Sequence, residues 1–195
     1  MQYKKQEISD RILSAGRKEY ALKGYRSGNI SDIARAAGVP VGNLYRYYDG
    51  KMGLLTAIVR PAYVKVPKML DELFSEANDV ARFNATILTQ KLFEIYDKYG
   101  TDILILADKC ASTRYEDFFD KLVEKSDKLL LHSLFKSPTE SDLCFCRIIS
   151  RAFVSSVFDV LRCGSDREQI KSMLERMTVF FFDEIDARIH GGDNE

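Results

Sequence analysis

Helical periodicity runs along most of the chain and constrains the fold more than any other feature of the sequence. Apolar residues recur at intervals of three and four positions, strand-like alternation is absent, and only 4 prolines and 11 glycines interrupt 195 residues. The pattern predicts an all-α protein. Beyond residue 51 we expect six or seven helices, with breaks near Pro61, Pro67, 78–79, Gly100, 112–113, 137–138 and 163–165.

The first fifty residues predict three short helices. The first covers residues 8–23 and ends at Gly24, since glycine is the usual residue after a helix C-terminus. Asn29 caps a second helix, because its side chain can accept a hydrogen bond from the free N–H groups of the first turn. Gly38 ends that helix where the chain turns through positive φ, and a third helix follows at residues 41–48.

The spacing of small and apolar residues in these helices predicts a helix-turn-helix. Ala34, Gly38 and Leu44 let the second and third helices cross closely through a tight turn. The outward face of the third helix instead carries donors, acceptors and phenol groups, from Asn43, Tyr45, Arg46 and Tyr47. Asn can bind adenine, Arg can bind guanine, and Tyr hydroxyls commonly bind phosphate, so this helix is suited to the major groove of DNA.

The distribution of charge agrees with a DNA-binding N-terminus. The formal net charge of the chain is zero. Residues 1–53 nevertheless hold ten Lys and Arg against five Asp and Glu, while residues 54–195 hold 19 against 24. A basic N-terminal segment on an acidic body can be attracted to phosphates although the whole chain is neutral.

The motifs at residues 12–15, 23–25, 30–39 and 42–48 resemble the N-terminal domain of the TetR family of transcriptional regulators, over about residues 8–58. The resemblance implies a three-helix DNA-binding domain at residues 1–52. It also implies a helical effector-binding and dimerisation domain at residues 53–195.

The family's DNA contacts, carried over by position, fall on Ser27, Asn29, Ser31, Val41, Gly42, Asn43, Tyr45, Arg46, Tyr47 and Lys51. Two departures from the family pattern change what these contacts imply. The family commonly has Ser-Lys where this chain has Pro40-Val41, and threonine where it has Asn43, so one phosphate contact and the base preference are expected to differ.

The last two long helices, at residues 138–163 and 166–190, carry apolar residues over more surface than one intramolecular partner would bury. The resemblance implies that they form a four-helix bundle with a second copy. We expect a homodimer that reads two half-sites of a palindromic operator in double-stranded DNA. The alternative is that these apolar residues close the core of a monomer. The predicted interface consists of Ala152, Phe153, Ser156, Val157, Val160, Met177, Phe180, Phe181 and Ile185.

The middle helices, expected at residues 80–99, 101–111 and 115–135, combine aromatic and polar side chains. By the resemblance, they enclose a pocket for an unknown small-molecule effector, lined by Phe83, Gln90, Phe93, Tyr96, Asp108 and Phe118. The same residues at helical spacing are also expected in an ordinary core. The resemblance implies a repressor that the effector releases from its operator; activation, or regulation without a ligand, stays open.

Other classes of function find little support in the sequence. His132 and His190 are the only histidines, and no nucleophile motif, phosphate-binding loop or metal-ligand spacing occurs. We therefore expect no enzyme activity, cofactor or metal, and buried, reduced thiols at Cys110, Cys144, Cys146 and Cys163. The N-terminus lacks the apolar stretch of a secretory signal, and no apolar run approaches the roughly 20 residues of a membrane span, which predicts a cytoplasmic protein. Two alternatives stay open: a helical protein-interaction module with a degenerate DNA-binding head, and a small helical enzyme.

Overall fold

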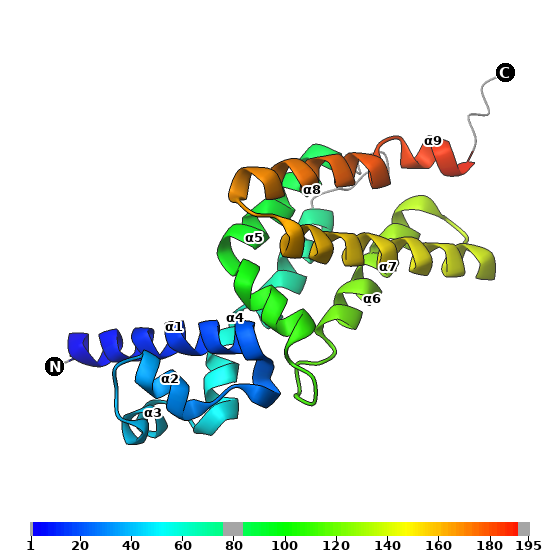
Figure 1. The fold of residues 1–195 in the computed structure, drawn as a ribbon. Helices are drawn as coiled ribbons and strands as arrows, with labels where there is room; N and C mark the ends of the chain where they lie inside the picture. The colour runs from blue at the N-terminus through cyan, green and yellow to red at the C-terminus, as the bar shows by residue number, and fades with distance from the viewer. Residues whose placement is uncertain (1, 76–83, 191–195) are drawn as a thin grey trace. The chain divides into compact units, whose positions relative to one another are not determined.

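The computed structural model describes residues 2–75 and 84–190, and within these ranges all regular secondary structure is helical (Figure 1). The prediction of an all-α fold is confirmed. The helices are α1 (Gln2–Ser27), α2 (Ile30–Ala36), α3 (Val41–Tyr47), α4 (Gly50–Ser75), α5 (Ala85–Asp108), α6 (Phe118–Leu134), α7 (Glu140–Cys163), α8 (Arg167–Phe182) and α9 (Ile185–His190).

The chain forms two compact units. The first unit contains Met1–Lys65 and Tyr99–Phe118, and the second contains Val66–Lys98 and Phe119–Glu195. α4 and α5 therefore contribute to both units. The domain boundary expected after residue 52 stays a prediction, since packing units and functional domains need not end at the same residue.

The first unit packs α1, α2 and α3 around the first half of α4. Its fully buried side chains include Ile12, Tyr20, Ile33, Leu44, Leu54, Leu55 and Ile58. Gly16 permits the close approach of α1 to α4, because a Cβ at this position would lie 3.0 Å from side-chain atoms of both Leu54 and Ile58. Gly24 has a φ of 76° and interrupts the helical conformation of α1. The first helix thus stops being regular where the sequence predicted, although it begins six residues earlier than expected.

Three predicted helix breaks are wrong. Pro61 and Pro67 lie inside α4, and Gly100 lies inside α5. A proline inside a helix removes one backbone hydrogen bond and costs about 3 kcal/mol. The buried face of α4, which includes Val59 and Ala62, offsets this cost by removing apolar surface from water. Gly100 is itself buried, where a residue without a side chain allows close packing.

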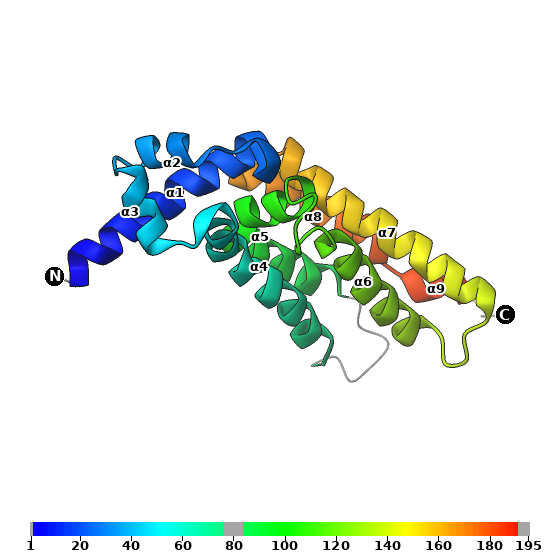
Figure 2. The same cartoon turned by 90° about the horizontal axis from the view of Figure 1, so that it is seen from below.

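The second unit is built around an apolar cluster. It comprises Leu88, Leu130, Leu134, Cys146, Phe153, Phe182 and Ile185. α7 and α8 pack against each other in this unit (Figure 2). Thr139 and Asp142 form a capping box at the start of α7, and Asp166 caps α8. The last predicted helix is divided, since Glu184 has a φ of 51° between α8 and α9. The expectations for residues 78–79 and for the start of the helix at residue 80 fall outside the described residues.

The four cysteines divide into two pairs. Cys110 and Cys146 are buried, and burial raises the pKa of each thiol to about 11. Cys144 and Cys163 are exposed, so the prediction of buried thiols is wrong for these two. No group of three His, Cys, Asp or Glu side chains in the described ranges lies close enough to hold a metal ion. Across residues 2–75 and 84–190, no helix combines the length and the apolar character required to cross a bilayer.

Candidate nucleic-acid interface

The turn between α2 and α3 has the geometry that the sequence predicted. The Asn29 side chain accepts a hydrogen bond from the Ser31 N–H at 2.7 Å and so caps α2. Gly38 has a φ of 66°, a conformation that favours glycine. Val39 then donates its N–H to the Ala34 carbonyl at 3.0 Å, which closes the end of α2. Both the predicted cap and the predicted turn are confirmed.

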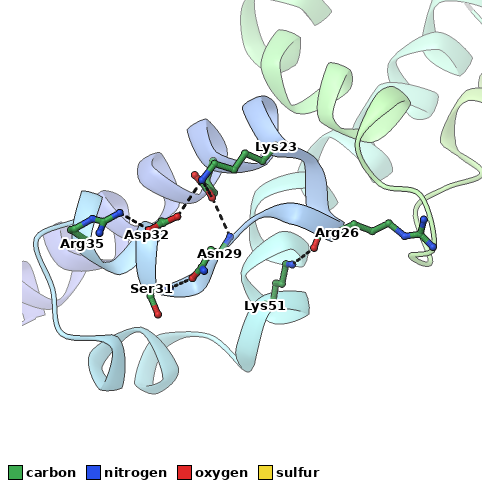
Figure 3. Close-up of polar contacts among 8 residues, drawn as sticks. Lys23, Arg26, Asn29, Ser31, Asp32, Arg35 and Lys51 are labelled. Atoms are coloured by element: carbon green, nitrogen blue, oxygen red, sulfur yellow. Dashed lines mark hydrogen bonds and ion pairs between the residues drawn. The ribbon is translucent and has the colours of Figure 1, made fainter.

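A polar frame of five residues holds the start of α2 against α1 (Figure 3). Glu19 accepts from the Asn29 N–H at 3.1 Å and from the Lys23 ammonium at 2.9 Å. Lys23 also pairs with Asp32 at 3.2 Å, and Asp32 accepts from Arg35 at 2.5 Å. The hydrogen bonds to Glu19 and Asp32 raise the pKa of Lys23. Two cations of this region are thus paired with carboxylates, while Asn29 is fixed at the helix start.

The inner face of α3 is anchored to α1. Leu44 is fully buried. The Tyr48 hydroxyl lies 2.7 Å from the Ser9 hydroxyl, and burial raises the pKa of this tyrosine. Because one side of α3 is held in this way, its other side faces outward.

The ten residues predicted to contact DNA are all at least partly accessible. Ser27, Asn29, Ser31, Val41, Gly42, Tyr45 and Arg46 are exposed, and Asn43, Tyr47 and Lys51 are half-buried. Arg46 forms no ion pair with any residue that the structure describes. The outward face of α3 therefore combines an amide, a guanidinium and two phenols on an anchored helix, which is a surface that can approach the edges of base pairs.

Lys51 is tied to the end of α1. Its ammonium donates to the Arg26 carbonyl at 2.9 Å and lies 4.9 Å from the centroid of the Tyr25 ring (Figure 3). The Lys51 carbonyl accepts from the Tyr20 hydroxyl at 3.1 Å. The ammonium has three N–H groups, so this arrangement leaves donors for a phosphate oxygen.

The C-terminal half of α5 and the loop after it belong to the same unit, which the sequence did not indicate. Arg17 forms two hydrogen bonds with the buried Asp102 carboxylate, at 2.5 and 3.1 Å. Tyr25 donates its N–H to the Lys109 carbonyl at 3.0 Å. The one available signal was an acidic residue, Asp102, directly before an apolar run in the sequence.

The residues predicted for an effector pocket are divided between the two units of the chain. The Phe93 and Tyr96 rings lie 5.9 Å apart in the second unit, with the Arg167 guanidinium 5.0 Å from the centroid of the Phe93 ring. Phe118 is buried in the first unit beside Tyr63. Gln90 and Asp108 are exposed, and Phe83 falls outside the described residues. An open groove of about 490 Å³ follows α4 and contains none of the predicted residues; it is lined by Gly53, Thr56, Ala57, Arg60, Pro61, Val64 and Lys65. The effector pocket stays a prediction.

The residues predicted for dimerisation divide between the core and the surface. Phe153, Val160 and Ile185 are buried in the second unit. Ser156, Val157, Met177 and Phe181 are half-buried, and Ala152 and Phe180 are exposed. The structure adds exposed apolar side chains that the sequence analysis missed, at Leu143, Phe145, Ile148 and Val179. Phe145 and Ile148 continue the spacing of three and four residues to Ala152, whereas Leu143 and Val179 do not, and periodicity alone did not distinguish these side chains from core positions.

Comparisons with known proteins agree with this geometry. Residues 12–58 match the family model for bacterial regulatory proteins of the tetR family. A sequence relative, the HTH-type transcriptional regulator YdgC of Bacillus subtilis, is 22% identical over 102 residues, which is about half the length of each chain.

Two solved structures share the fold over most of the chain. A transcriptional regulator of Aquifex aeolicus has a TM-score of 0.59 at 19% identity, over 90% of this chain and 99% of that one. NalD of Pseudomonas aeruginosa, the secondary repressor of a multidrug efflux pump, has a TM-score of 0.55 at 23% identity, over 88% and 94% of the two chains. The matched segment contains α2, the turn and α3 described above, and the family is one of regulators rather than enzymes. Residues 12–58 of this chain therefore match the DNA-binding domain of the tetR family of transcriptional regulators, and the chain as a whole shares the fold of such regulators.

Proposed function

We propose that this protein is a homodimeric repressor that binds a palindromic operator through α3 and is released by a small-molecule effector. One observation carries the proposal: the inner face of α3 is anchored by Leu44 and Tyr48, while its polar face is accessible. A helix held in this way can present side chains to the major groove without first ordering them, which lowers the entropic cost of binding.

The side chains of α3 and its neighbours divide into two kinds of contact. Asn43 and Arg46 supply the groups that bind adenine and guanine edges. Tyr47 and Lys51 supply hydroxyl and ammonium donors of the kind that contact phosphate, and Tyr45 offers both a hydroxyl and an exposed ring. Ser27, Asn29 and Ser31 cluster around the capped start of α2 and complete the phosphate contacts on that flank, while Val41 and Gly42 begin α3.

A second copy of the chain is needed because one short helix makes too few contacts for specificity. The exposed apolar side chains of α7 and α8 supply a surface for it. Ile148 is 61% exposed and Phe180 is 73% exposed, and both lie on helices that pack against each other. Burying such side chains against a second copy removes apolar area from water. A symmetric dimer would place two α3 helices on half-sites about one helical turn apart, roughly 34–36 Å, or a multiple of it.

Release by an effector follows from linkage. A ligand that binds better to the DNA-free form weakens DNA binding, and a coupling of about 1–3 kcal/mol gives a useful switch. The naming of NalD as a repressor of an efflux pump supports repression in this fold. For this chain, repression and release remain the proposal.

The experiment is selection of bound duplexes from a random pool with the full-length protein. We expect enrichment of an inverted repeat with two equivalent half-sites. Affinity for the selected duplex should fall about a thousandfold or more between 50 and 200 mM salt, as for a protein that neutralises six to ten phosphates. Recovery of no sequence, or binding without salt dependence, would contradict the proposal and favour a protein-interaction module.

Matched variants identify the contacts. Asn43→Ala and Arg46→Ala should each relax the preference at one position of the half-site, at a cost of about 1–3 kcal/mol per half-site. Lys136→Ala removes an exposed cation of the second unit and is the control for charge. Equal losses from Lys136→Ala and Arg46→Ala would mean that total charge, rather than α3, determines binding.

A further inference from the structure

Two large apolar side chains on α3 are exposed. Val41 is 37% exposed and Tyr45 is 57% exposed. They are four residues apart, so they lie on the same face of the helix. In the described part of the first unit the other exposed large apolar residues are Leu22 on α1 and Val64 on α4. We call Val41 and Tyr45 the apolar stripe of α3.

The surroundings of the stripe are open and polar. Gly42 follows Val41, and a Cβ added there would meet no atom within 4 Å. Asn43 is half-buried and Arg46 is exposed on the same short helix. The fold does not bury the stripe, because α3 is anchored through Leu44 instead. The stripe is therefore available to a binding partner together with the polar groups beside it.

The chemistry of the major groove leaves one apolar group for such a stripe. Base edges there present nitrogen and oxygen donors and acceptors, and the C5-methyl group of thymine is the apolar exception. An exposed valine beside an amide and a guanidinium gains free energy in the groove by covering that methyl group, whereas a valine placed over a polar base edge would desolvate that edge without giving it a hydrogen bond.

We infer that the apolar stripe of α3 reads thymine methyl groups in each half-site of the operator, with Val41 as the residue that determines this specificity. The inference rests on the proposed binding of α3 in the major groove. The stripe spans about 6 Å at 1.5 Å per residue, against about 3.4 Å per base step. Val41 and Tyr45 thus cover positions about two base steps apart.

The experiment replaces each thymine of the selected operator by uracil, which removes only the methyl group. At the thymine that Val41 covers, we expect affinity for the full-length protein to fall about fourfold per half-site, since one buried methyl group contributes about 0.8 kcal/mol. Changing both half-sites should lower the affinity about tenfold or more. Uracil at positions that neither Val41 nor Tyr45 covers should leave binding unchanged.

Variants assign the effect to the stripe. At the position that Val41 covers, Val41→Ala should discriminate less between thymine and uracil while keeping the preferences given by Asn43 and Arg46. Tyr45→Phe keeps the ring and should keep the discrimination at its own position, whereas Tyr45→Ala should lose it. Leu22→Ala, which shortens an exposed apolar side chain on α1, should keep the full ratio between thymine and uracil operators.

The possible outcomes separate this inference from the proposed function. A wild-type protein that binds both operators equally, or a Val41→Ala variant that still discriminates fully, would overturn the role of the stripe while leaving specific DNA binding intact. Failure to enrich any duplex would instead overturn the proposed function, and the inference with it.

Discussion

The two units of the chain use different means to define their surfaces. In the first unit, polar contacts between named partners join the helices in addition to the buried apolar core: the frame around Asn29, the ion pair of Arg17 with Asp102, and the contact of Tyr48 with Ser9. The second unit is held by an apolar cluster and leaves large apolar side chains on α7 and α8 in solvent. Under the proposed function, the first unit binds DNA through polar side chains of its own, whereas the exposed apolar surface of the second unit is the face proposed to bind a second copy of the chain.

The largest expected effect tests whether the second unit forms a dimer interface with another copy of the chain. Phe180→Asp places a charge on a side chain that is 73% exposed. The single chain should still fold, because this position lies outside the core, but a dimer interface cannot bury the charge without a large desolvation cost. We expect a monomer in analytical ultracentrifugation. Operator affinity should fall by at least about a hundredfold, since the DNA-binding helices of two copies no longer bind the two half-sites together.

The control comes from the other unit. Leu22 is 76% exposed on α1, so Leu22→Asp introduces the same charge at similar exposure. This variant should remain dimeric. If both variants remain dimeric, α8 is not the interface and the contrast between the units fails.

The sequence predicted the first unit well because local chemistry determines its turns. Asn29 caps α2 and Gly38 turns at positive φ in any tertiary context, so single residues gave the correct boundaries. The helix breaks predicted at Pro61 and Gly100 are wrong for the opposite reason. Burial along α4 and α5 outweighs their unfavourable helix propensity, and such burial depends on residues far away in the chain.

The second unit was less predictable because a helical stripe does not reveal what covers it. Phe153 and Phe180 have similar character and spacing in the sequence, yet Phe153 is 6% exposed and Phe180 is 73% exposed. In the first unit, the ion pair of Arg17 with Asp102 was also not predicted, because its partners are 85 residues apart in the sequence. Periodicity gives the elements, whereas the assignment of a face to the core or to an interface requires the packed structure.

The second prediction concerns the ion pair that joins α1 to α5. Arg17→Met leaves the nearly buried Asp102 carboxylate without its guanidinium, and we expect the free energy of unfolding to fall by about 2 kcal/mol. Hydrogen exchange should rise in α1 and in residues 99–108, but not in α7 and α8. Lys128→Met removes the exposed pair with Glu124 in the second unit and should change nothing measurable. Faster exchange in both units after Arg17→Met would show that the units do not unfold separately.

A smaller effect is expected at the anchor of α3. Tyr48→Phe removes the hydroxyl that lies 2.7 Å from the Ser9 hydroxyl while keeping the ring, and should cost about 1 kcal/mol of stability. Operator affinity should fall with little change in base preference, because α3 is less firmly held while its outward side chains are unchanged. Tyr96→Phe makes the same change in the second unit and should leave operator binding intact. A changed base preference in Tyr48→Phe would mean that this hydroxyl sets the orientation of α3 on DNA.

The smallest expected effect is on the pH dependence of stability, and it compares the two units through one buried thiol in each. Cys110 in the first unit and Cys146 in the second are both buried, and burial raises each thiol pKa from 9.0 to about 11. Between these values the unfolded chain loses protons that the folded chain retains, so stability is complete below pH 9 and falls as the pH rises through 9. From pH 8 to 9.5 we expect a loss of less than about 1 kcal/mol per thiol in urea unfolding.

Single variants divide this loss between the units. Cys110→Ala and Cys146→Ala should each remove about half of the pH dependence contributed by the two thiols, while Cys163→Ala, which changes an exposed thiol, should leave it unchanged. Equal halves would mean that the interiors of the two units exclude water equally well. If Cys110→Ala removed little of the pH dependence and Cys146→Ala removed most of it, water would have easier access to the first unit, and the contrast between the units would extend from their surfaces to their interiors.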